Sequence, residues 1–374
     1  MSPLPFRSCP RPTLGVEMDL QLLDADSLDL TPGAPRIFSV LGGEDPRIRP
    51  ELFQSMIEVD TGVCETPAQV REDLRSSLSR LRKAKPDWMQ FACAGSHPFA
   101  RYADSVIYPA ERFRLLMERN QWAARRIMTF ALHLHRGVRD GEHAVAMINF
   151  LLPYLPHFLA LSASSPFWQG EDTGLASSRI TVFEALPTAG HPPAYASWAE
   201  FEALHDSLVA SGSIASIKDL WWDIRPRPEY GTVEIRICDG VPTLSETIAL
   251  VALFEALCRR LDEAYGAGER PEPPPDWLVR ENKWRASRYG LEADILVDPA
   301  GRTASLRKEV AKLVELLRSG PPWPGKDRAV ATLERMLEQG CSHERQRRVA
   351  RRGGSLKAVA EALVEEFRTN RPIY

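Results

Sequence analysis

The sequence predicts an α+β protein, in which an antiparallel sheet is backed by helices. Two observations carry this prediction. Strand-like and helix-like segments follow one another over the first 240 residues, with long insertions between the strands. After residue 277 the segments all have the pattern of helices. Strands first and helices gathered at the end are typical of α+β proteins.

The first strand is predicted over residues 13–23, where polar and apolar side chains alternate. Glu17 and Asp19 are interleaved with Val16, Met18 and Leu20. Because successive side chains of a strand point to opposite faces, one face is apolar and the other carries two acids. Similar patterns predict strands at 52–62, 88–95, 127–138, 216–224 and 231–238, and residues 24–50 form a polar, Pro/Gly-rich excursion.

Helix starts are marked by capping residues. Thr66 precedes Pro67 and is followed by Gln69 three positions later, which is the pattern of a capping box with proline at the first helical position. Ser197 and Thr243 have the same relation to a later glutamate. The predicted helices cover 67–85, 110–128, 142–161 with a break at its prolines, a segment after Ser197, 244–265 and 353–367.

The chain divides at one linker-like stretch, "AYGAGERPEPPPDW". This gives a sheet-bearing part over 1–266, a linker over 267–276 and a helical part over 277–374. We expect all of 1–374 to form a single catalytic domain.

Composition excludes several classes of protein. The net charge of −3 over 374 residues gives no electrostatic basis for binding nucleic acid or an anionic membrane. The basic run 344–352 is therefore interpreted as a solvated helical face. No signal peptide is evident, and the longest apolar stretches are too short or too interrupted to span a bilayer. Six scattered cysteines without a C-x-x-C pair argue against zinc and disulfides, and favour a cytoplasmic protein.

Four predicted strands share one design, a polar face opposite an apolar face. If they lie in one sheet, their polar faces collect these side chains: Glu17, Asp19, Gln54, Met56, Glu58, His133, His135, Glu234, Arg236 and Cys238. So many acids together are costly unless cations neutralise them. A set rich in oxygen ligands and poor in nitrogen suits Mg²⁺ or Mn²⁺ better than Zn²⁺.

Each of these features has an ordinary alternative. Asp19 is compatible with a solvated strand, "HLH" with two hydrogen-bonded histidines, and Glu234 with a surface ion pair to Arg236. The joint occurrence on four strands favours a site. The sequence contains neither a P-loop motif nor G-x-G-x-x-G, so it supports neither nucleotide-binding mode.

Seven segments together resemble the glutamate–cysteine ligase type 2 family, and more narrowly the YbdK-like carboxylate–amine ligases. They are "TLGVEMDLQLLD", "SMIEVDTGVC", "GSHPFARY", "LHLHRGV", "SPFWQGEDTGLASSR", "WWDIRPRPEYGTVEIRICD" and "NKWRASRYGLEADI". The resemblance implies a glutamine-synthetase-like fold with the active site on one sheet face. It also implies ATP-dependent joining of a small-molecule carboxylate to an amine through an acyl-phosphate.

The resemblance assigns roles to individual residues. Glu17, Asp19, Glu58, His133 and Glu234 look like magnesium ligands. His133 and His135 would contact metal or nucleotide phosphate, and Arg236 would stabilise the transferring phosphoryl group and contact the nucleotide. Arg179 is a catalytic candidate for phosphate or substrate carboxylate.

Three positions depart from the family pattern. Asp19 stands where glutamate is usual, Arg136 replaces valine on the face opposite the histidines, and Arg227 replaces serine two residues before Glu229. The last pair puts the nominal substrates, glutamate and cysteine, in doubt. A specialised biosynthetic amide ligase, a metal-dependent hydrolase and a non-catalytic binding protein are the alternatives. The apolar faces of the terminal helices fit a homodimer and equally fit the core.

Overall fold

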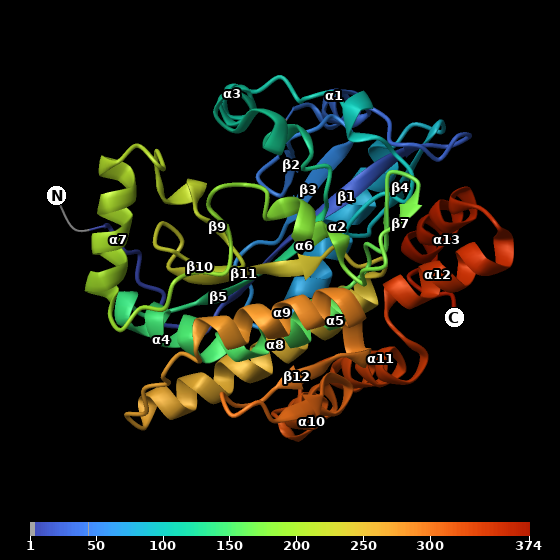
Figure 1. Cartoon of the computed structure of the whole chain (residues 1–374). Coiled ribbons are helices and arrows are strands. Elements are labelled where there is room, and N and C mark those ends of the chain that lie inside the picture. Colours follow the sequence, from blue (N-terminus) through green and yellow to red (C-terminus); the bar gives the residue numbers. More distant parts are fainter. Residues whose placement is uncertain (1–3, 44) are drawn as a thin grey trace.

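An antiparallel sheet forms the centre of the computed structural model, which describes residues 4–43 and 45–374 (Figure 1). Among these residues its seven strands are β1 (Leu14–Asp24), β2 (Ile48–Pro50), β3 (Met56–Asp60), β4 (Met89–Ala92), β5 (Ala131–Gly137), β10 (Ile224–Arg227) and β11 (Thr232–Asp239). Their order is β10-β11-β5-β1-β3-β2, and β4 pairs with the end of β1. The central position of β1 follows from its length, because it pairs with β5 and then β4 along one edge and with β3 along the other.

The apolar face of the sheet packs against helices. Val16, Met18 and Leu20 are at most 2% exposed and belong to one core with residues of α2, α4, α5 and α8. The helices are α1 (Ala34–Leu41), α2 (Pro67–Ala84), α3 (Glu111–Arg125), α4 (Gly141–Leu151), α5 (Leu155–Ser162), α6 (Ser178–Phe183), α7 (Trp198–Ala210), α8 (Leu244–Gly266), α9 (Asp276–Tyr289), α10 (Leu306–Ser319), α11 (Lys326–Gln339), α12 (Ser342–Gly353) and α13 (Leu356–Thr369). The predicted α+β fold class is confirmed.

The predicted helix caps are present. The side chains of Thr66, Ser197 and Thr243 each accept a hydrogen bond from the backbone N–H three residues later. Such caps satisfy N–H groups that the first helical turn leaves without a partner. The capping residues therefore set where α2, α7 and α8 begin.

The helix expected over 142–161 is interrupted as its prolines predict. A short 3₁₀ turn at Leu152–Tyr154 separates α4 from α5. The combined stretch Gly141–Ser162 is long and apolar enough to cross a membrane by length and composition alone, but 83% of its apolar window is buried inside the protein. It is a core helix pair.

Three local predictions were wrong. The excursion over 24–50 contains α1 and β2, and the strand expected over 216–224 is a 3₁₀ turn (Ile217–Asp219) followed by the short strand β9 (Trp221–Trp222). The part after residue 277 is not wholly helical, because β12 (Asp294–Leu296) and β13 (Thr303–Ser305) form a hairpin. Two further short pairs are β6 (Phe167–Trp168) with β7 (Glu171–Asp172) and β8 (Ala189–Gly190) with β9.

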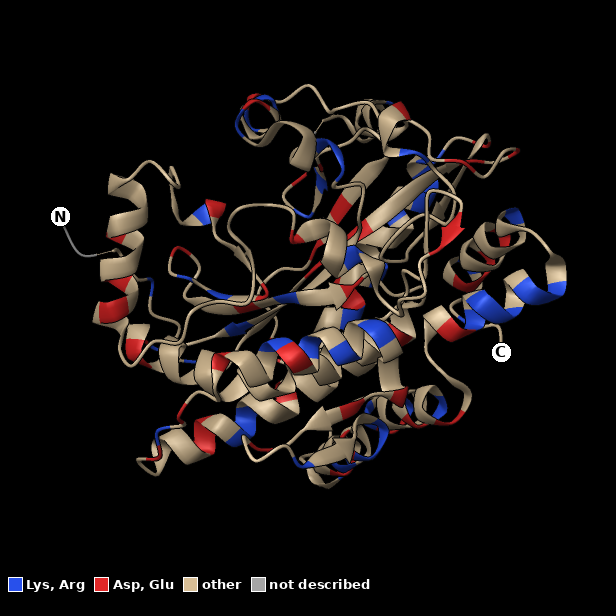
Figure 2. Cartoon of the chain, viewed as in Figure 1, with Lys and Arg blue, Asp and Glu red and all other residues tan. Residues whose placement is uncertain are grey.

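The C-terminal helices pack onto the sheet-bearing part. Leu306, Leu333 and Phe367 share the main core with the apolar face of β1. The whole basic run 344–352 lies on α12, where basic residues are spread along the helix (Figure 2). One of them, Arg345, is turned inward and pairs with Glu246 and Glu366.

Candidate active site

Strand register brings the predicted polar residues together on one face of the sheet. Glu17 lies opposite His133 on β5 and opposite Asp60 on β3, and the pair Asp19 and Glu58 follows two residues along. Glu234 lies opposite His135 on one side and Arg225 on the other. Since side chains alternate in direction along each strand, this register places the acids and histidines side by side.

Three of the five predicted metal ligands form a tight cluster. One ligand atom from each of Glu17, His133 and Glu234 lies within 4.8 Å of the others. His133 Nδ1 is 2.9 Å from Glu17 Oε2 and 3.6 Å from Glu234 Oε1. Two carboxylates and one imidazole are a donor set that binds divalent cations.

The protonation state of His133 suits a ligand. Burial, reinforced by the charge of Arg236, lowers the pKa of His133 to about 4, so its imidazole is neutral at pH 7. Its Nε2 is buried without a hydrogen-bond partner among the described residues. A neutral imidazole with a free ring nitrogen can donate an electron pair to a metal. The residues therefore fit a bound cation.

Glu17 is charged although it is enclosed. Burial acts to raise its pKa, but the charge of His135 and hydrogen bonds from His133 and His135 bring the pKa well below its usual range. His135 Nε2 lies 3.2 Å from Glu17 Oε1, and its Nδ1 lies 3.2 Å from the hydroxyl of Thr232. His135 therefore orients Glu17 from the side opposite His133.

Glu234 is surrounded by three arginines. The Oε2 atom of Glu234 lies 2.9 Å from Arg225 Nε and 3.0 Å from Arg227 Nη1. Its Oε1 atom contacts Arg236. Burial acts to raise the pKa of Glu234, but these three charges lower it well below its usual range. In this structure the carboxylate is thus an arginine partner and a neighbour of His133 at the same time.

Asp19 and Glu58 lie on the same face but outside the three-residue cluster. Asp19 Oδ2 accepts a hydrogen bond of 2.7 Å from the Ala131 N–H, and Glu58 lies 2.6 Å from Arg49. Burial and then the charge of Glu51 raise the pKa of Asp19 to about 8. Burial and the neighbouring charge of Glu17 raise the pKa of Glu58 well above its usual value. A cation beside them would relieve both shifts.

Arg179 lies at the start of α6 and contacts β11. It is 2% exposed and donates to the carbonyl oxygens of Arg236 and Ile237. Burial lowers its pKa. Asp239, which is fully buried, lies 3.9 Å from the Arg179 guanidinium and accepts hydrogen bonds from Ser165 and Ser177 in the preceding loop. The predicted catalytic arginines 179 and 236 therefore meet at one strand.

Arg49, Asp60 and Arg225 of this face escaped sequence reasoning. Arg49 pairs with both Glu58 and Asp60, and burial followed by the charge of Glu17 raises the pKa of Asp60 to about 7. Asp60 could have been predicted from the sequence, because it lies two residues after Glu58 on the same strand and so faces the same side. Arg49 was not, because β2 has only three residues.

Two of the positions predicted for this face, Cys238 and Gln54, are wrong. Cys238 was expected beside Glu234 and Arg236, but it belongs to the apolar core and pairs with Leu132. The register of β11 against β5 shifts between Ile235 and Cys238. Such a bulge inserts a residue and reverses the alternation beyond it. Gln54 precedes β3 and binds the carbonyl of Ile107, so it lies off the strand.

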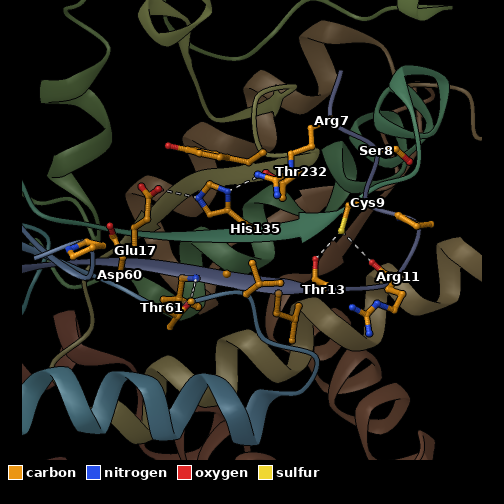
Figure 3. Close-up of a pocket in the computed structure, with 18 of the residues that line it drawn as sticks. Arg7, Ser8, Cys9, Arg11, Thr13, Glu17, Asp60, Thr61, His135 and Thr232 are labelled. Carbon is orange, nitrogen blue, oxygen red and sulfur yellow. Dashed lines mark hydrogen bonds and ion pairs between the residues drawn. The ribbon is translucent and has the colours of Figure 1, made fainter. Parts of the chain in front are cut away.

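Two cavities meet at this face. One of about 690 Å³ contains Glu17, Asp19, Glu58, Arg179 and Arg236 in its lining. The other, of about 570 Å³, extends from Glu17 and His135 to the N-terminal segment around Cys9 and Thr13 (Figure 3). Glu17, Arg49 and Tyr230 line both. The cluster thus stands between two spaces of substrate size.

Comparison with known proteins identifies the family of this chain. The family model of glutamate-cysteine ligase family 2 matches residues 13–362. A Thermobifida fusca protein named "Putative glutamate--cysteine ligase 2" is 47% identical over 98% of this chain and 94% of its own length. A Bdellovibrio bacteriovorus protein of the same name is 44% identical over 98% of this chain and 97% of its own length.

Solved structures share the fold at low identity. The glutamate–cysteine ligase of Francisella tularensis, solved in complex with AMP, superposes with a TM-score of 0.69 at 11% identity over 99% of this chain and 91% of its own. A bifunctional glutathione synthetase from Pasteurella multocida superposes with a TM-score of 0.65 at 15% identity, over 96% of this chain and 52% of its own length.

The fold and these relatives define the chain as an ATP-dependent ligase of the carboxylate–amine class, which confirms the predicted enzyme class. It belongs to glutamate-cysteine ligase family 2.

Proposed function

We propose that this chain is a Mg²⁺-dependent ligase, with Mn²⁺ as an alternative ion, that activates a carboxylate as an acyl-phosphate and joins it to an amine. The observation that carries the proposal is the cluster of Glu17, His133 and Glu234 between two cavities, with Arg236 in contact with it. Glutamate with cysteine is the substrate pair that the family name suggests, and weak activity with this pair belongs to the proposal.

The residues have distinct roles in this reaction. Glu17, His133 and Glu234, with Asp19 and Glu58 beside them, would hold Mg²⁺. When bound, the ion would neutralise and orient the ATP triphosphate. His135 orients Glu17 through the 3.2 Å contact to its carboxylate and would lie near the phosphates.

The arginines act on the transferred group. A substrate carboxylate oxygen attacks the γ-phosphorus of ATP, ADP leaves, and the amine nitrogen then attacks the acyl carbon and releases phosphate. Negative charge accumulates on the phosphoryl oxygens in the first step. Arg236, which faces the cluster, would stabilise that charge, while Arg179 would hold phosphate or substrate carboxylate.

An ADP-release screen against a matrix of carboxylates and amines tests the proposal. We expect ADP and phosphate only with Mg²⁺ and a matching carboxylate, and full turnover only when an amine is added. Metal-dependent cleavage of a substrate without nucleotide would point to a hydrolase, and nucleotide binding without turnover to a binding protein. A cytoplasmic location, to which the six free cysteines are suited, belongs to this proposal, as does the homodimer.

A further inference from the structure

The 690 Å³ cavity has two unlike ends. Its charged end is the sheet face with Glu17, Asp19, Arg179 and Arg236. Its other end is formed by apolar side chains from three elements, which we call the apolar wall: Phe113, Leu115 and Leu116 of α3, Phe183 of α6 and Trp221 of β9. In Figure 1 α3 and α6 lie on the same side of the sheet.

The apolar wall begins beside the predicted catalytic arginines. The ring of Phe183 lies 5.8 Å from the Arg179 guanidinium and 5.9 Å from that of Arg236. The wall then continues to Leu115, whose side chain is 51% exposed. A molecule whose carboxylate meets these arginines would therefore extend its other end over apolar surface.

The charged groups at the apolar end are largely engaged. Arg119 is paired with Asp219 at 3.2 Å. Arg112 donates to the Pro50 carbonyl at 2.7 Å and stacks on Phe113, with its guanidinium carbon 4.3 Å from the ring centre. Lys218 lies on the exposed rim. A second carboxylate placed beside Arg112 or Arg119 would have to displace existing partners, whereas an alkyl or aryl group would simply lose contact with water.

We propose that the carboxylate substrate carries an apolar side chain, aryl or branched alkyl, that packs on the apolar wall. This inference rests on the proposed function and names its substrate class. It predicts that a monocarboxylic apolar acid is a better substrate than a dicarboxylic amino acid such as glutamate. The discrimination comes from the 690 Å³ cavity and not from the metal cluster, which meets only the reacting carboxylate.

The test compares acids with one common small amine. ADP release is measured with Mg²⁺-ATP and hydroxylamine, using 3-phenylpropionate and 4-methylpentanoate against glutamate and succinate. We expect kcat/KM for the apolar acids to exceed that for the dicarboxylates by at least about tenfold, the discrimination that an apolar pocket typically provides. Equal or better use of glutamate or succinate overturns the inference and leaves the proposed ligase intact. Failure of every acid overturns both.

A pair of variants locates the effect. Leu115→Asp places a charge on the apolar wall at a position exposed enough to leave folding unaffected, and should lower kcat/KM for 3-phenylpropionate at least about tenfold. Trp122→Asp is the matched control, because Trp122 is 55% exposed in α3, just beyond the kink at Gln121, and does not line this cavity. Equal activity of Leu115→Asp and Trp122→Asp, with unchanged thermal unfolding, contradicts the inference.

Discussion

At the scale of single residues, Glu17 is the central side chain of the proposed site. This side chain contacts both histidines and lines both cavities, and it remains charged against the effect of burial. Its neighbours on the strand are apolar, so the alternation that was visible in the sequence is the physical reason for its position.

Substitution Glu17→Gln should lower turnover at least about 100-fold, because it removes a charged ligand while keeping the shape of the side chain. The measurement is ADP release at saturating Mg²⁺. Asp24→Asn is the control, since Asp24 ends the same strand and only caps a turn at Ser27. Wild-type turnover by Glu17→Gln would remove Glu17 from the metal site.

Asp19 gives a pH dependence with a defined sign. Its folded-state pKa is about 8, whereas an unfolded aspartate titrates near 3.9, so the folded protein holds a proton that the unfolded chain has released. Stability of the metal-free protein should therefore fall as pH rises from about 4 to about 8, by up to about 1.4 kcal/mol per pH unit from this group.

Asp19→Asn should flatten that slope, because its amide oxygen still accepts from the Ala131 N–H but carries no titratable proton. Denaturant unfolding between pH 5 and 8 in EDTA measures the difference. Parallel curves for the two proteins would show that Asp19 titrates normally.

At the scale of elements, β11 and the loop before α6 build the arginine side of the site. Asp239 accepts from the Ser164 N–H and from the hydroxyls of Ser165 and Ser177. It thereby fastens residues 164–178 to the strand that bears Arg236. The bulge in β11 brings Asp239 into this position.

Asp239→Asn should lower turnover about tenfold or more and reduce stability by about 1–3 kcal/mol, because an amide NH₂ replaces an oxygen that faces donors. Ser177→Ala, which removes one of the three donors, should cost less. Activity and thermal unfolding are measured together. An unchanged turnover in Asp239→Asn would show that the loop needs no anchor there.

The sequence predicted a strand well when the strand was long and its polar and apolar residues alternated regularly. Period-two alternation was enough to find β1, β3, β5 and β11 and six of the acids and histidines on their polar face. It failed where the period breaks, at the bulge that turns Cys238 into the core, and where an element is too short to show a period, as in β2 with Arg49. Arg225 and Arg227 alternate on β10 and both contact Glu234, but only Arg227 was singled out from the sequence, as a departure from the family pattern.

At the scale of the whole molecule, buried ion pairs join the last helices to the sheet-bearing part. Arg345 of α12 is 2% exposed and pairs at 2.8 Å with Glu246 of α8 and with Glu366 of α13. Arg136 stands on the apolar face of β5, where the family usually has valine. It forms an ion pair within the chain, with Asp262 of α8. The division at 267–276 stays a prediction.

Arg345→Met should cost about 3–5 kcal/mol of unfolding free energy, since it leaves two buried carboxylates without their partner. Arg351→Met on the exposed side of α12 is the control and should change stability little. Denaturant unfolding followed by circular dichroism gives both values. Equal stabilities would mean that α12 and α13 are held by apolar contacts alone.

The central claim is that ATP activates a carboxylate as an acyl-phosphate on this sheet face. Turnover of an acid labelled with ¹⁸O in its carboxylate tests it most directly, because the mechanism transfers one carboxylate oxygen to the released phosphate. We predict phosphate with one ¹⁸O per amide formed, and loss of that product in Glu17→Gln. Unlabelled phosphate, or release of AMP and pyrophosphate, would contradict the mechanism.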